Sequence, residues 1–182
     1  MSFGSSKKID TEDELYAYAL GALARQMRSV AELKRLLRRR VDTGTEYGHT
    51  LIELVVRRLK DHGYLNDAAY ASAYSSFRRD NQKFGRMRVI SDLKAKGVHA
   101  DVIGSAVDSS YAEVNEERQA RQYLRRRRLA KPKDQKQAAR IFRQLSRAGF
   151  RAKTIFGILK KWDVDDETIA LLEQDEPEQG WG

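Results

Sequence analysis

Apolar residues recur every three or four positions along most of the chain, which is the spacing of one buried helical face. Leu15, Ala19 and Leu23 show this spacing near the beginning of the chain, and Ile155 and Leu159 show it near the end. Glycines and short polar stretches interrupt the pattern in between. The periodicity predicts an all-α protein.

Short polar signals indicate where these helices begin. Serine or threonine followed three residues later by glutamate is the spacing of a capping box, in which both side chains bond backbone N–H groups at a helix start. The chain has this spacing at 11–14, 29–32 and 50–53, and each pair predicts a helix start. Residues 42–48 are expected to form a loop before the third of these helices.

The stretch from Gly63 to Val107 has the clearest helix boundaries. Gly63 and Gly97 each follow a basic helix end and precede an apolar residue, which is typical of a Schellman motif. Three helices are predicted here, over about 66–81, 85–96 and 100–110. The face of the first helix that is expected to be buried consists of Ala69, Tyr70, Ala73, Tyr74 and Phe77. Core packing is favoured over base stacking for its two tyrosines.

The chain also repeats itself. An offset of 52 residues superposes Gly97 on Gly149 and Leu93 on Leu145, within a set of seven matched pairs. Repeats of this kind bury their apolar faces only against neighbouring repeats, so three tandem three-helix repeats in an elongated stack are predicted. The predicted segments are a disordered N-terminus at 1–9, repeats at 10–62, 63–112 and 113–173, and a disordered acidic tail at 174–182.

Composition adds a charged surface to this picture. Charged residues make up 34% of the chain and the formal net charge is +9, against about 25% charged residues in ordinary domains. This balance favours an anionic partner, which leaves a nucleic acid, an acidic protein surface or an anionic membrane. The acidic end beyond Asp163 either folds back on the basic face or is solvated, and solvation is favoured.

The candidate binding residues are cations that cluster in the second and third repeats. In the second repeat they are Arg78, Arg79, Lys83, Arg86, Arg88, Lys94 and Lys96. In the third repeat they are Arg125, Arg126, Arg127, Arg128, Arg147, Arg151 and Lys153. Because arginine suits carboxylates and phosphates equally, these residues alone do not separate a protein partner from a nucleic-acid backbone.

Catalytic chemistry has little support in the sequence. The chain has no phosphate-binding loop, no nucleophile elbow and no H-E-x-x-H pattern. It has no cysteine, and its three histidines lie next to predicted helix ends, so no catalytic residue, metal or cofactor is expected. Without a long apolar run or a secretory leader, we expect a cytoplasmic protein that does not enter a membrane.

An ordered series of short motifs resembles a known family. The motifs are Gly63-Tyr64-Leu65-Asn66-Asp67, Tyr70-Ala71, Lys83-x-Gly85 and Leu93-Lys94-x-Lys96-Gly97-Val98. Together they resemble the central segment of the RecX regulators of the RecA recombinase, and the resemblance extends more weakly over residues 15–172.

The resemblance implies a curved, all-α monomer that lodges in the groove of the RecA–DNA filament. Such a protein binds RecA, inhibits its ATP hydrolysis and strand exchange, limits filament growth or persistence, and is not itself an enzyme. Weak direct contact with single- or double-stranded DNA is compatible with this role. The alternative is a stand-alone, sequence-nonspecific DNA-binding protein of the nucleoid-associated kind, and an enzyme acting on DNA ranks third.

Overall fold

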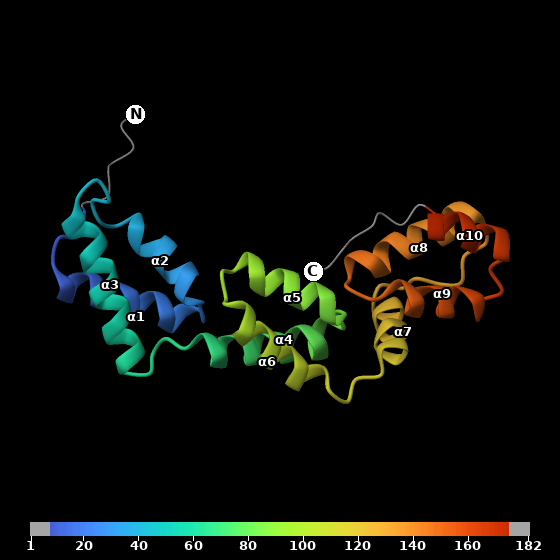
Figure 1. Ribbon diagram of the computed structural model, residues 1–182, viewed down its shortest axis with the longest axis horizontal. Helices are drawn as coiled ribbons and strands as arrows, with labels where there is room; N and C mark the ends of the chain where they lie inside the picture. Colours follow the sequence, from blue (N-terminus) through green and yellow to red (C-terminus); the bar gives the residue numbers. More distant parts are fainter. Residues whose placement is uncertain (1–7, 175–182) are drawn as a thin grey trace. The chain divides into compact units, whose positions relative to one another are not determined.

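The computed structural model describes residues 8–174, and this part of the chain consists of helices and their connections (Figure 1). The helices are α1 (Glu12–Arg25), α2 (Val30–Arg38), α3 (Glu46–Asp61), α4 (Asp67–Gln82), α5 (Arg86–Ala95), α6 (Ala100–Tyr111), α7 (Glu116–Arg126), α8 (Gln135–Arg147), α9 (Ala152–Lys160) and α10 (Asp166–Gln174). The all-α class predicted from the sequence is confirmed. Most of the two termini predicted to be disordered, including Trp181, lies outside the described residues.

The first compact unit consists of the described residues up to Tyr74 together with Asp92–Ala106. Its main core lies among α1, α2 and α3, which pack on one another in pairs. Each helix contributes a fully buried leucine to this core, namely Leu15, Leu33 and Leu59. The apolar spacing of the sequence therefore indicates the correct inward faces of all three helices.

The second compact unit consists of Ser75–Ser91 together with the described residues from Val107 onward. Its core is formed mainly by α7, α8, α9 and α10, with α8 packed on both α9 and α10. Leu145 of α8 and Ile158 of α9 are fully buried at its centre. The exposed cations of α7, α8 and α9 are therefore carried by helices that share one apolar core.

Two of the predicted helix starts show how local signals succeed and fail. Ser29 and Glu32 form a complete capping box, since each side chain accepts the other residue's backbone N–H at 3.1 Å. The start predicted at Thr50 is wrong, because α3 already begins at Glu46. The Oγ1 atom of Thr45 accepts the N–H of Gly48 at 3.1 Å, so the cap lies five residues before the predicted one at Thr50.

The glycine helix ends are confirmed. Gly63, Gly97 and Gly149 have φ angles of 74°, 76° and 89°, in the left-handed region that glycine adopts without a Cβ clash. The N–H of Val98, just after Gly97, donates to the carbonyl of Leu93 at 3.2 Å, which is the closing bond of a Schellman motif. These turns fix where α3, α5 and α8 end.

The buried face predicted for α4 is wrong in part. Tyr70 is buried as expected, but Ala69 and Ala73 are exposed and Phe77 is 54% exposed. Alanine lies on several sides of this helix, so apolar spacing alone does not define one inward face. The rotation of α4 is instead set by Tyr70, whose hydroxyl donates to Glu32 at 3.1 Å.

The boundaries predicted for the disordered ends also need correction. Lys8 and Ile9 are ordered, because the Ile9 N–H donates to the carbonyl of Arg40 at 2.7 Å and Lys8 Nζ to that of Val41 at 3.0 Å. Carbonyl groups after the last turn of α2 lack helical partners, so they accept these bonds. At the other end, Gln174 is the last residue of α10 and not part of the tail.

Candidate partner-binding surface

The candidate cations lie on several helices of both units. Lys94 and Lys96 belong to the first unit, at the end of α5 and in the turn that follows. All the other candidates belong to the second unit, on α4, α5, α7, α8 and α9 or in the turns next to them. Their side chains differ greatly in how many internal partners they have.

Arg79 is tied into the fold of the second unit. Its guanidinium pairs with the Asp80 carboxylate at 2.7 Å and also donates to the carbonyl of Ser110 at the end of α6. The hydrogen bonds to Asp80 raise the pKa of Arg79 and lower the pKa of Asp80. Arg79 therefore connects α4 to α6, a role that its sequence position does not reveal.

Two further candidates pair with carboxylates of neighbouring helices. Arg86 at the start of α5 pairs with Asp108 of α6. The Nε atom of Arg151 lies 3.4 Å from Glu116 of α7, whose carboxylate also accepts the Arg151 backbone N–H at 3.0 Å. Since both arginines remain partly exposed, these pairs contribute little stability by themselves, on the order of 0–1 kcal/mol each.

Two more of the candidate arginines lie against the ring of Phe84. The guanidinium carbon of Arg78 lies 5.3 Å from the centre of the Phe84 ring, and that of Arg88 lies 5.7 Å from it. Arg88 also donates to the carbonyl of Arg147 at 3.5 Å. Both arginines are thus positioned by an aromatic ring in the loop between α4 and α5.

Lys96 belongs to a cluster that we call the polar joint, made of Ser29, Glu32, Asp67, Tyr70 and Lys96. Lys96 Nζ donates to Glu32 at 2.8 Å, while the Lys96 carbonyl accepts the Ser29 hydroxyl at 2.6 Å. Asp67 accepts the N–H of Val30 at 2.8 Å, at the start of α2. The polar joint therefore fastens α2 to α4 and to the turn after α5.

Glu32 and Lys96 form an ion pair within the polar joint. Burial alone would raise the pKa of Glu32, but hydrogen bonds from Lys96 and from the Ser29 N–H, with the Lys96 charge, lower it on balance. Burial alone would lower the pKa of Lys96, and its interactions with Glu32 and Tyr70 raise it instead. Both groups are therefore held in their charged forms.

Other candidates carry exposed charges. Among residues 8–174, no carboxylate lies within ion-pair distance of Lys94, Arg125, Arg126, Arg128, Arg147 or Lys153, and all six are exposed. Arg127 lies beside the ring of Tyr123, with its guanidinium carbon 5.5 Å from the ring centre. These residues are the part of the predicted surface that is open to an external anion.

A second cluster, which we call the glycine joint, consists of Gly85, Met87, Ala148 and Gly149. The N–H of Gly85 donates to the carbonyl of Ala148 at 2.8 Å, and that of Met87 to the carbonyl of Gly149 at 3.3 Å. A Cβ on Gly149 would lie 2.2 Å from the backbone nitrogen of Arg88. Two backbones therefore meet here without intervening side chains, which fastens the start of α5 to the turn between α8 and α9.

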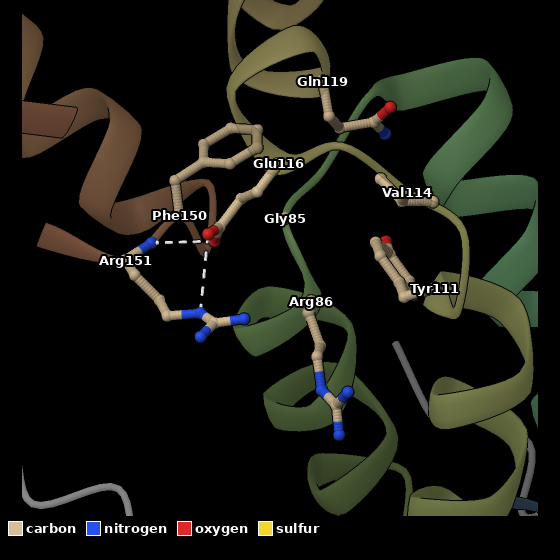
Figure 2. Close-up of a pocket in the computed structure, with 8 residues that line it drawn as sticks. All are labelled: Gly85, Arg86, Tyr111, Val114, Glu116, Gln119, Phe150 and Arg151. Carbon is tan, nitrogen blue, oxygen red and sulfur yellow. Dashed lines mark hydrogen bonds and ion pairs between the residues drawn. The ribbon is translucent and has the colours of Figure 1, made fainter. Parts of the chain in front are cut away.

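A small polar cavity lies beside the glycine joint. Figure 2 shows Arg86, Tyr111 and Gln119 around it, with Glu116 bonded to Arg151 at its edge. Its volume is about 60 Å³, whereas sites for small molecules occupy about 300–1,000 Å³. The cavity has room for a water molecule or two, not for a nucleotide.

Sequence reasoning missed one set of cations. Lys136, Arg140 and Arg143 of α8 are exposed and share a helical face with Arg147, the only one of the four that was predicted. The signal was present as a spacing of four, three and four residues, which places side chains on one side of a helix. It was overlooked because these cations are separated by other residues and do not form a run.

Within residues 8–174, no group of three His, Asp or Glu side chains is placed to hold a metal ion. None of the helices in that range is long and apolar enough to cross a membrane. The fold and surface therefore define a class of all-helical proteins built from three-helix repeats that present exposed cations.

Known proteins identify the family within this class. The family model described as "RecX, second three-helix domain" matches residues 66–107. Regulatory protein RecX of Myxococcus xanthus is 36% identical over 155 residues, which cover 79% of this chain and 80% of the relative. Regulatory protein RecX of Thermobifida fusca is 29% identical over 180 residues, covering 97% and 92%. The chain belongs to the RecX family of regulatory proteins.

Solved structures agree on the fold. The crystal structure of RecX from Lactobacillus salivarius superposes with a TM-score of 0.60 at 21% sequence identity, covering 84% of this chain and 96% of the other. At this identity the likeness concerns the fold alone. The three-helix repeats predicted from the internal offsets are consistent with it.

Proposed function

We propose that this protein binds the RecA recombinase and the RecA–DNA filament, and that it inhibits RecA ATP hydrolysis and strand exchange. The observation that carries the proposal is membership of the RecX family, through 36% identity to a RecX regulatory protein over about four fifths of both chains. The exposed cations support the same proposal, because a nucleoprotein filament offers both acidic side chains and phosphates as partners. The function is binding and not catalysis.

The physical basis of the inhibition is a shift between filament states. A ligand that binds one filament geometry more tightly than another holds the filament in that geometry, so any step that requires the geometry to change becomes slower. In each unit, a joint holds the backbone that carries candidate cations. The polar joint holds the turn that follows Lys94, and the glycine joint holds the start of α5 and the turn before α9. Because the backbone that carries these cations is already ordered, less conformational freedom is lost on binding, so more of the interaction energy favours the bound geometry.

The proposed contacts divide by how they are paired. Lys94, Lys153 and the run Arg125–Arg128 are the first choice, because they are exposed and have no carboxylate partner among the described residues. Arg79, Arg86 and Lys96 pair with Asp80, Asp108 and Glu32, so they hold the fold that presents the first set. Arg147 joins this first choice, because it is also exposed and has no carboxylate partner among the described residues. Arg78, Lys83, Arg88 and Arg151 extend the proposed surface in the second unit.

The test is the DNA-dependent ATPase of RecA. The protein should lower the rate of ATP hydrolysis when present well below one molecule per RecA protomer, because one bound regulator restricts several protomers of a cooperative filament. An unchanged rate at equimolar protein would contradict the proposal. A salt titration of binding to bare duplex DNA tests the alternative function, that of a stand-alone DNA-binding protein. Tight binding with no preference for RecA-coated strands would support that alternative.

A further inference from the structure

The outer face of α8 carries four cations in a straight row. We call Lys136, Arg140, Arg143 and Arg147 the α8 row; all four are exposed. They follow one another at intervals of four, three and four residues, so at 1.5 Å of rise per residue the row spans about 16 Å. One strand of DNA presents a phosphate about every 3.4 Å along the duplex axis, so the length of the row matches the length of several consecutive phosphates.

The inner face of the same helix fixes the direction of the row. Ala138, Ile141, Phe142 and Leu145 are buried in the core of the second unit. The start of the helix is capped by Asp134, which accepts the N–H of Gln137 at 2.8 Å. Its far end runs into the glycine joint. The helix therefore cannot turn about its axis, and the four cations lie on one side together.

Internal carboxylates do not neutralise the row. Asp134 is the only acidic residue between Glu117 and Asp163 in the sequence, and its carboxylate is engaged at the cap. Within residues 8–174, no carboxylate lies within ion-pair distance of any of the four cations. Arg79 and Lys96, by contrast, are paired with Asp80 and Glu32 inside the fold. The α8 row thus carries four charges that still need counterions.

The surroundings of the row favour phosphates over a protein surface. The exposed residues of α8 are Gln135, Lys136, Gln137, Arg140, Arg143, Ser146 and Arg147. None of them is aromatic or aliphatic, whereas protein–protein interfaces are anchored by buried aromatic and apolar side chains. A purely cationic and polar face is what sequence-independent binding to a nucleic-acid backbone requires.

We infer that α8 binds the phosphate backbone of DNA through Lys136, Arg140, Arg143 and Arg147. The inference rests on the proposed function for its setting, since it names the helix that meets the DNA of the filament. The contact is electrostatic and independent of base sequence, because the row has no aromatic side chain to stack on bases. It requires no RecA, so it is tested on bare DNA.

The experiment compares two variants with equal loss of charge. The row variant carries Lys136→Gln, Arg140→Gln, Arg143→Gln and Arg147→Gln. The control variant carries Arg38→Gln, Arg39→Gln, Arg57→Gln and Lys60→Gln, four exposed cations of the first unit. Glutamine has a helix propensity close to that of lysine and arginine, so both variants keep their helices, which circular dichroism checks.

Fluorescence anisotropy with labelled oligothymidine and with a labelled duplex measures affinity over a range of salt. Loss of four phosphate contacts should reduce the slope of log K against log [salt] by about 3, at 0.7–0.9 for each contact. We expect this fall, with at least about tenfold weaker binding at low salt, for the row variant alone. The two DNA probes distinguish single-stranded from double-stranded backbones.

Three outcomes would overturn the inference. The first is an unchanged salt slope in the row variant, and the second is a loss of affinity in the control variant as large as that in the row variant. The third is a row variant that still binds DNA but no longer binds polyglutamate. The last result would assign the α8 row to an acidic protein surface. Inhibition of the RecA ATPase is measured separately, so failure there leaves the DNA result standing, and the reverse also holds.

Discussion

The backbone of Gly85 lies directly against the carbonyl group of Gly149, so that a Cβ on Gly85 would be 2.3 Å from that oxygen. The two residues belong to different predicted repeats and are brought together by the hydrogen bonds of the glycine joint. Gly85 is also part of the motif by which the sequence resembles the RecX family. The resemblance therefore includes a residue whose role is close backbone contact.

Gly85→Ala tests the glycine joint. The added methyl group meets a backbone oxygen that no side-chain rotation can move, so the joint must open or distort. We expect a loss of about 1–3 kcal/mol in the free energy of unfolding, measured by urea denaturation. The matched control is Gly157→Ala in α9, where the new Cβ would meet nothing within 4 Å apart from the backbone of its own helix. That variant should gain about 0.5–1 kcal/mol, and equal losses in both would contradict the assigned contact.

Glu32→Gln tests the polar joint through pH. The pKa of Glu32 in the folded protein is lowered from 4.5, so the ionised carboxylate stabilises the fold above that value and this stability is lost as pH falls through the folded pKa. Removing the charge should flatten the acid limb of stability below about pH 4.5. Thermal denaturation at a series of pH values from acid to neutral measures this change in the pH dependence of stability. The control is Glu14→Gln, which removes an exposed carboxylate of α1. An unchanged acid limb in the Glu32 variant would count against the joint.

Asp67→Ala tests how α2 is started. Asp67 belongs to α4 yet accepts the N–H of Val30, so its loss leaves the first turn of α2 without that acceptor. We expect a loss of about 0.5–2 kcal/mol in the free energy of unfolding, as for other helix caps. Asp61→Ala at the last residue of α3 removes the same charge from a helix C-terminus, where a carboxylate is unfavourable. It should cost nothing, and a similar loss in both variants would point to a general charge effect.

Reversing two exposed cations tests the proposed function. Lys94→Glu with Lys153→Glu alters no ion pair among the described residues, so the double variant should unfold like the wild type. Its binding to RecA filaments on single-stranded DNA should weaken by roughly tenfold, because each site loses an attraction and gains a repulsion. Co-sedimentation with the filaments measures this. The control is Arg57→Glu with Lys60→Glu, which makes the same charge change on α3. Unaltered co-sedimentation of the first variant would show that Lys94 and Lys153 are not part of the binding surface.

The helices were predictable because their signals are local. The capping box at Ser29 and the glycine ends at Gly63 and Gly97 depend on residues within one turn, and the structure confirms all three. The prediction at Thr50 is wrong because a threonine three residues before a glutamate also occurs inside a helix, and the N-cap of α3 is Thr45.

The pairing of the cations was not predictable, because their partners are distant in the sequence. Lys96 meets Glu32 across 64 residues, and Arg79 meets the carbonyl of Ser110 across 31. No periodicity within a helix encodes such contacts. Net charge therefore indicated an anionic partner, while the division into paired and exposed cations required three-dimensional packing.

The glycine joint has a consequence for how these repeats tolerate change. Nearly every residue has the same backbone N–H and carbonyl groups. The hydrogen bonds of the glycine joint therefore do not depend on which side chains surround them. Substitutions on the surrounding surface leave the glycine joint intact as long as Gly85 and Gly149 remain glycine. Exchanging the segment from α7 to α10 between two chains that both have Gly85 and Gly149 should therefore preserve the glycine joint, even where most other residues differ.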